Sequence, residues 1–307
     1  MLPSNLLAKL TLTIKPEDKM KISTEIGSIS RLVGEEKAIE YVANSGFDAW
    51  DFSLFELCRY DRVNKKVIPS DHPLAGKDYL KFAKRLKEIG LNNGIICNQT
   101  HAPFPLEAPE VRDSIKKAIE CTAEVGAEIC VIHPQKLLTH EQNAQMYMEY
   151  LPFAKSCGVK IAAENIWIWD PENQRALHAA CSTPQSFCDH IDAVGDDSFV
   201  ACLDIGHAEM MGEGVSASKM IKALGKRLGA LHIHDNDKRH DCHQIPFSMD
   251  IDFVSVVSAR KKIDYKGYFT LESNDYLKNF TKDNVHIAVD DFAKAAKKLA
   301  NMFDSIN

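Results

Sequence analysis

The 307-residue sequence predicts a single-domain α/β protein, a (β/α)₈ or TIM barrel, and three observations lead to that fold class. Eight short, continuously apolar segments alternate with segments whose apolar residues recur every three or four positions. Continuous apolar runs are typical of parallel strands that are covered on both faces. No linker or low-complexity stretch interrupts the series, and the length suits a barrel of about 250 residues with additions.

The predicted strands and helices follow one another from Met20 to the end of the chain. The strands are residues 20–26, 47–54, 92–103, 127–134, 159–165, 197–207, 228–237 and 266–274. The helices are residues 35–46, 76–90, 108–126, 140–158, 183–195, 215–227, 249–263 and 285–303. Several helices end at a glycine, the residue that most readily takes the left-handed cap conformation: Gly46, Gly90, Gly126 and Gly158. Residues 1–19 show no clear period, so we expect an N-terminal extension outside a barrel of residues 20–307.

A doubly wound open sheet is the alternative architecture for alternating strands and helices. An open sheet spreads its strand ends along an edge, whereas a barrel gathers them around one point. Acidic and imidazole side chains follow at least five of the predicted strands directly. A barrel would bring these groups together, and we therefore favour it.

Composition restricts the classes of partner. Apolar residues make up 45% of the chain and charged residues 26%, and no apolar run approaches the roughly 18 residues of a membrane helix. The net charge of −6 and the lack of a basic stripe argue against a nucleic-acid partner. Nine scattered cysteines without a CxxC pair favour reduced thiols and a cytoplasmic protein. We expect a small-molecule substrate and no membrane partner, with self-association into a homo-oligomer left open.

Four potential metal ligands end four consecutive predicted strands. They are Glu164, Asp204, His232 and Glu272. Three carboxylates with one imidazole suit Mn²⁺ best among the ions considered, with Mg²⁺, Co²⁺ and Zn²⁺ as alternatives. His234 lies two residues beyond His232, and on a strand the two would face the same side, so either could bind the metal.

Further polar and aromatic residues lie at the same predicted strand ends or just beyond them. The candidates for substrate binding are His101, His133, Trp167, Asp170, His207, Asp241 and His243. Neutral imidazoles can donate to hydroxyl groups or share a proton with a reacting oxygen. The aromatic stretch after Glu164 suits the wall of a small-molecule pocket.

These motifs resemble the xylose isomerase-like barrel superfamily of sugar isomerases and epimerases, and the resemblance runs from about Met20 to the end. It implies that Glu164, Asp204, His232 and Glu272 hold a divalent metal, and that Glu164 and Glu272 also form the acid/base pair. It further implies substrate binding by His207 and, through a looser match, by Asp170. The implied reaction is proton abstraction next to a carbonyl, leading to isomerisation or epimerisation of a sugar, sugar phosphate or keto-sugar. A 1,2-hydride shift between two metals is the other mechanism of the family and stays open.

Two other activities of the same superfamily remain open. A lyase acting on a keto-sugar, such as a C-glycoside deglycosidase subunit, would use the same proton abstraction. The endonuclease IV branch has nine metal ligands, and this chain resembles that set as well. The matching residues are His101, His133, Glu164, Asp204, His207, His232, Asp241, His243 and Glu272. That branch implies a trinuclear zinc site for cleaving DNA at abasic positions, but no basic equivalent of its DNA-gripping loops is evident here.

Overall fold

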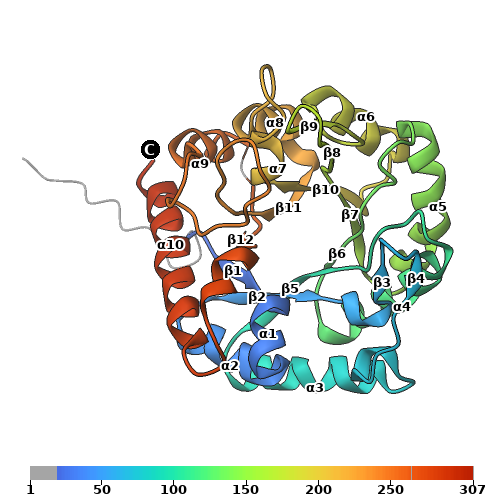
Figure 1. The fold of residues 1–307 in the computed structure, drawn as a ribbon, viewed down its shortest axis with the longest axis vertical. Coiled ribbons are helices and arrows are strands. Elements are labelled where there is room, and N and C mark those ends of the chain that lie inside the picture. The colour runs from blue at the N-terminus through green and yellow to red at the C-terminus, as the bar shows by residue number, and fades with distance from the viewer. Residues whose placement is uncertain (1–18, 264, 307) are drawn as a thin grey trace, which may run out of the picture.

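The computed structural model describes residues 19–263 and 265–306 and confirms the barrel. Eight parallel strands form its wall (Figure 1). They are β1 (Ile22–Glu25), β2 (Ala49–Ser53), β5 (Ile96–His101), β6 (Ile129–Val131), β7 (Lys160–Glu164), β10 (Phe199–Asp204), β11 (Leu228–His232) and β12 (Phe269–Leu271). Their spatial order is β11-β10-β7-β6-β5-β2-β1-β12, and Ile233 bridges Leu271 to bring the two outer strands together. The strand ends therefore converge, as only the barrel alternative predicts.

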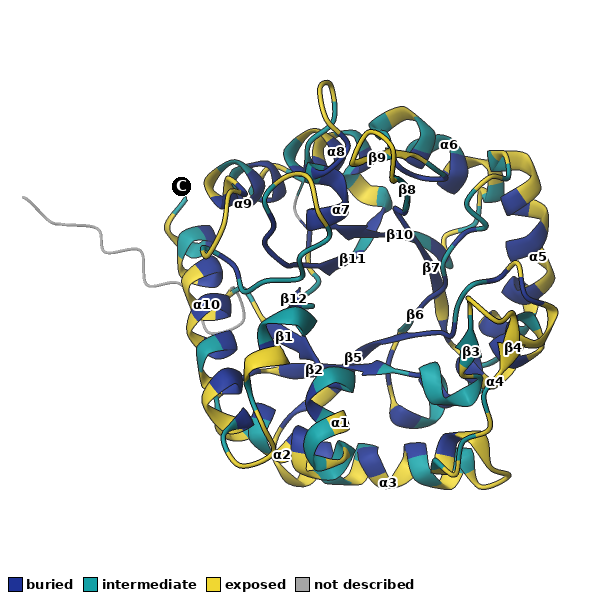
Figure 2. Cartoon of the chain, viewed as in Figure 1, coloured by how far each residue is buried: buried dark blue, intermediate teal, exposed yellow. Residues whose placement is uncertain are grey.

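Helices surround the barrel and bury one face each against it (Figure 2). They are α1 (Gly27–Val33), α2 (Glu35–Asn44), α3 (Tyr79–Asn92), α4 (Pro109–Val125), α5 (His140–Ser156), α6 (Pro184–Val194), α7 (Ile205–Glu209), α8 (Ala217–Leu224), α9 (Phe253–Lys261) and α10 (Val285–Ser305). In α3, Ala83 and Leu86 are fully buried while Lys84 is exposed, as the helical spacing predicts. Thr139 caps α5 through the backbone amide of Gln142, whose side chain bonds back to the Thr139 amide.

The interior of the barrel changes character along its axis. Small apolar side chains from neighbouring strands pack together in one layer: Val131, Ala162, Cys202 and Ala230. Polar side chains link strands that are not neighbours, as in the 2.6 Å bond from Ser23 Oγ to Asn98 Oδ1 and the 3.2 Å bond from Asn98 Nδ2 to Thr270 Oγ1. These bonds satisfy polar groups deep in the protein and hold the strands in register.

The structure adds short elements that the sequence pattern did not predict. Two antiparallel hairpins project from the strand-end face, one formed by β3 (Tyr60–Asp61) with β4 (Lys66–Val67) and one by β8 (Trp167–Asp170) with β9 (Arg175–His178). The predicted strand 197–207 ends at Asp204, and its last residues form α7. The expected N-terminal extension falls almost wholly on residues 1–18, which lie outside the described residues.

The nine cysteines, all within the described residues, form no disulfide. No helix in the described part of the chain has the length and apolar character needed to cross a bilayer.

Candidate metal centre

Four polar side chains meet at the ends of four adjacent strands. Glu164 ends β7, Asp204 ends β10 and caps α7, His232 ends β11, and Glu272 follows β12. Glu164, Asp204 and His232 are at most 1% exposed. One potential ligand atom from each of the four residues lies within 4.8 Å of the others. The structure thus brings together the four residues that the sequence predicts as ligands.

The atoms that face one another in this quartet are those a cation would use. His232 Nδ1 lies 3.2 Å from Glu164 Oε2 and 3.2 Å from Glu272 Oε2. Glu164 Oε2, Asp204 Oδ2 and His232 Nδ1 are buried and have no hydrogen-bond partner among the described residues. A buried polar atom without a partner costs about 1–3 kcal/mol. A divalent cation would satisfy all three, so the donor set fits one.

The ionisation of these groups is tightly linked. Burial acts to raise the pKa of Glu164, but the positive charges of His232 and His133 outweigh it and hold the pKa well below its usual range. Burial likewise acts to lower the pKa of His232, yet Cys202, Glu272 and Glu164 raise it well above the ordinary imidazole value. Carboxylates this close together need positive charge between them, from protonated imidazoles or from a metal ion.

His101 and His133 form a second group that faces the same carboxylate oxygen of Glu164 as His232 does. Their Nε2 atoms lie 3.3 and 3.4 Å from Glu164 Oε2, and 3.1 Å from each other. With Glu164 they make another set of three ligand atoms within 4.8 Å of one another. Glu164 is therefore shared between two neighbouring groups of potential ligands.

A third group consists of His207, His234, Asp241 and His243. Asp241 lies at its centre, with carboxylate oxygens 3.5 Å from His207 Nε2, 3.5 Å from His234 Nε2 and 3.2 Å from His243 Nε2. The side chains of His232 and His234 thus lie in different groups, although either could have joined the quartet in the predicted strand. His234 nevertheless also borders the quartet, because its Nε2 lies 3.2 Å from Asp204 Oδ1.

Two carboxylates near the quartet were missed at the sequence level. Asp51 lies in the middle of β2, and its Oδ2 lies 3.2 Å from His232 Nε2 and accepts a 3.0 Å bond from Gln99 Nε2. Glu25 ends β1 and accepts hydrogen bonds from Ser28. Glu25 lies at a strand end like the predicted ligands, so the same positional signal could have found it. Asp51 lies in the middle of β2, level with Glu25 in the register, and that signal does not reach it.

Asp51 is expected to orient His232, because the ring nitrogen facing Asp51 is the one that points away from the quartet. Asp51→Asn should weaken metal binding about 10- to 100-fold with the fold retained, since the carboxylate no longer holds the ring and its tautomer. Competition of the purified protein against a metal-binding dye measures this affinity. Asp283→Asn, at an exposed residue of a distant turn, is the matched control. Equal affinities in the two variants would remove Asp51 from this role.

Glu25 is expected to make the metal-free protein less stable as the pH rises. Burial raises its pKa from 4.5 to about 7, with Glu272 and Asp51 adding to the effect and Ser28 opposing it. The neutral acid is therefore favoured in the fold, and its contribution is complete below pH 4.5 and lost as the pH rises through 7. Glu25→Gln should reduce the loss of unfolding free energy between pH 5 and 8 by about 2–3 kcal/mol. Urea unfolding with a chelator present tests this, and parallel pH profiles for both proteins would contradict it.

A cavity of about 790 Å³ opens above the three groups. Its lining includes His101, His133, Glu164, Trp167, His207, Asp241, His243 and Glu272. Six of the seven predicted substrate-binding residues thus line one cavity. Asp170 does not line it. Its carboxylate accepts bonds from the Glu172 and Asn173 amides and caps the β8–β9 turn.

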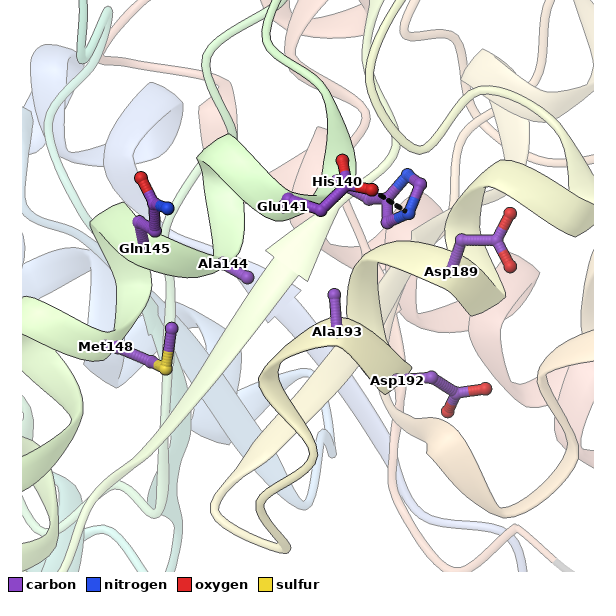
Figure 3. A pocket seen from close by; sticks show the side chains of 8 residues that line it. All are labelled: His140, Glu141, Ala144, Gln145, Met148, Asp189, Asp192 and Ala193. Atoms are coloured by element: carbon purple, nitrogen blue, oxygen red, sulfur yellow. Dashed lines mark ion pairs between the residues drawn. The ribbon is translucent and has the colours of Figure 1, made fainter.

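A separate hollow of about 500 Å³ lies on the outer wall between α5 and α6 (Figure 3). Its polar lining includes the ion pair of His140 with Glu141 at 3.0 Å, and the carboxylates of Asp189 and Asp192. The Asp192 carboxylate already binds Arg227 through two bonds of 2.6 and 2.7 Å. The side chains of this hollow thus include a carboxylate that is already paired, whereas the mouth of the barrel gathers groups of potential metal ligands.

Comparisons with known proteins agree with this architecture. Residues 39–302 match the family described as xylose isomerase-like TIM barrel. The chain is 24% identical over 256 residues to the uncharacterized protein MJ1311 of Methanocaldococcus jannaschii, and the match covers 78% of each.

Solved structures share the fold at low sequence identity. A D-tagatose 3-epimerase-like protein has a TM-score of 0.66 and 22% identity, over 92% of this chain and 98% of that one. The IOLI protein, solved with a zinc atom bound, has a TM-score of 0.67 and 18% identity, over 94% and 100%. Because the family match spans most of the sequence, this chain belongs to the xylose isomerase-like TIM barrel family.

Proposed function

We propose that this chain is a metal-dependent isomerase or epimerase of a sugar or sugar-derived substrate. The observation that carries the proposal is the joint position of Glu164 and Glu272. Both belong to the four-residue group that fits a cation, and both line the 790 Å³ cavity. The family match and the printed names of similar structures, among them sugar 3-epimerases, support the same class of reaction.

The two glutamates would move the substrate proton. A divalent ion held by Glu164, Asp204, His232 and Glu272, with Mn²⁺ favoured, would supply Lewis-acid stabilisation of charge developing on substrate oxygens. One glutamate takes a proton from the carbon next to a carbonyl. Return by the other to the opposite face gives an epimer, and return to the adjacent carbon gives an isomer. The imidazoles of His101, His133 and His207 would hold hydroxyl groups, and Trp167 would form an apolar wall.

Solvent exchange tests the proposal directly. With Mn²⁺ or Co²⁺ in deuterium oxide, the protein should introduce deuterium next to the carbonyl of a ketose, ketose phosphate or keto-sugar, as measured by mass spectrometry. Lyase action on a keto-sugar would begin with the same exchange and then release a second product. The absence of exchange into any of these compounds, with metal bound, would reject the proposal.

A second candidate is a phosphodiesterase of the endonuclease IV type. The observation favouring it is the third ligand group, in which three histidines surround Asp241 outside the quartet. Metal ions in all three groups would suit phosphodiester cleavage better than sugar chemistry. Efficient nicking of duplex DNA at an abasic site, without deuterium exchange into sugars, would favour the phosphodiesterase over the isomerase or epimerase.

A further inference from the structure

Two positively charged side chains from two different elements line the cavity near each other. Arg62 lies on the β3–β4 hairpin, and Lys136 lies on the loop between β6 and α5. Both line the cavity that holds the candidate metal ligands. We refer to Arg62 and Lys136 together as the rim cations.

Each rim cation packs over an aromatic ring, and that ring in turn lies next to a histidine of the site. The Arg62 guanidinium carbon is 4.4 Å from the centre of the Phe104 ring, and that ring is 4.6 Å from the ring of His133. Lys136 Nζ is 5.9 Å from the centre of the Trp167 ring, which is 6.3 Å from the ring of His207. Aromatic rings thus fix both charges at a short distance beyond the proposed reaction centre.

Neither rim cation forms an ion pair among the residues that the structure describes, although the charge of Glu107 acts on both. In the described part of the chain, no carboxylate lies within 4.0 Å of the charged nitrogens of either side chain. The nearby Glu107 uses Oε1 to accept a 3.1 Å bond from the Lys136 backbone amide. Burial lowers the pKa of Lys136, and the positive charge of Arg62 lowers it further, although Glu107 and Asp241 oppose the shift. Burial also lowers the pKa of Arg62.

We propose that the rim cations bind a phosphate monoester carried by the substrate, at the end remote from the carbon that reacts. This inference rests on the proposed sugar chemistry and names its substrate class. Two like charges held side by side in the wall of a cavity repel each other, and an anion between them relieves that repulsion. A phosphate can accept hydrogen bonds from two cationic side chains at once. Arg31 also lines the cavity, whereas Arg59 there pairs with Glu56 at 3.6 Å.

The arrangement favours a small phosphate ester over a nucleic-acid backbone. The cations converge on a cavity of about 790 Å³, a size that suits a small molecule. The chain carries a net charge of −6, and its sequence contains no long run of basic residues. Duplex DNA with an abasic site therefore serves as the competing probe.

Binding of non-reacting probes tests the rim cations independently of catalysis. Calorimetric titration of the metal-loaded protein would compare sorbitol 6-phosphate, sorbitol and inorganic phosphate. We expect the phosphorylated compound to bind the wild-type protein at least about tenfold more tightly than sorbitol. Arg62→Gln and Lys136→Gln should each weaken its binding about tenfold, and leave sorbitol binding unchanged, because each removes one charged donor. Lys66→Gln, which removes an exposed charge from the same hairpin without touching the cavity, should bind like the wild type.

The outcomes separate this inference from the proposed function. Deuterium exchange into an unphosphorylated ketose at full rate, with no preference for phosphate, would overturn the inference and leave the function standing. Phosphate-dependent binding that requires Arg62 and Lys136, without exchange into any ketose phosphate, would support the inference and reject the function. Tight binding of abasic DNA that depends on the rim cations, with no binding of sorbitol 6-phosphate, would also overturn the inference. Equal melting temperatures of the variants exclude a general loss of structure.

Discussion

Replacing Glu272 by glutamine is expected to lower solvent-deuterium exchange into the substrate by about 10²- to 10⁴-fold, the usual contribution of a general acid or base. Glutamine keeps the size of the side chain and one oxygen facing the metal position, but it cannot accept a proton. The Glu272 side chain is 15% exposed, compared with 2% for Glu164, so Glu272 presents the more accessible carboxylate to the cavity. The rate should be measured at saturating Mn²⁺, because a weaker ligand also reduces metal affinity.

Two further glutamate-to-glutamine variants test whether the loss of exchange is specific to the site. Glu164→Gln should also lose exchange, since the proposal requires both carboxylates. Glu88→Gln, which changes the same side chain at an exposed position on α3, should retain the full rate. Full exchange by the Glu272 variant, with metal bound, would show that another group carries the proton. Glu25 would then be the next carboxylate to test, because it lies close enough to Glu272 for their charges to interact.

The architecture and the grouping of the quartet could be predicted because a barrel gathers the carboxyl ends of all its strands around one axis. Strands β7, β10, β11 and β12 are largely apolar runs, and the residue that ends or follows each run is fixed in space by its neighbours. Asp204 and His232 are direct partners in the β10–β11 register, so their neighbourhood follows from the pairing of two strands. The polar residue at the end of each of these runs therefore indicated which four side chains come together.

The polar residues beyond the strand ends could not be placed in the same way. His234 follows the end of β11, where backbone direction depends on the bridge between Ile233 and Leu271 and on the pairing of Asp235 with Gln244. Asp170 follows an aromatic segment that forms a hairpin, and the turn after it uses its carboxylate locally. These positions depend on long-range contacts that no sequence period encodes. Arg62 and Lys136 belong to the same class, because the cavity they share is made by a hairpin and a loop.

The stoichiometry of bound metal is the second decisive quantity, and it depends on which of the three ligand groups holds an ion. If the quartet alone holds the metal, Asp204→Ala should abolish binding, because it removes a buried ligand that no neighbour replaces. His243→Ala should retain one equivalent per chain while exchange falls by about tenfold or more, since His243 would then contact substrate or its surroundings. Elemental analysis by mass spectrometry, after dialysis against a weak chelator, measures the metal in each protein.

His243→Ala distinguishes the two proposed functions because Asp241 joins His243 to two other imidazoles. His243 Nε2 lies 3.2 Å from Asp241 Oδ1, and the His234 and His243 rings stack with centres 3.9 Å apart. In a phosphodiesterase with three ions, these residues would be ligands, and the variant should fall from three equivalents towards two. His101→Ala would likewise empty a position next to Glu164. A single equivalent that persists in both variants, together with lost exchange, is the result expected of a sugar isomerase or epimerase whose additional histidines serve the substrate.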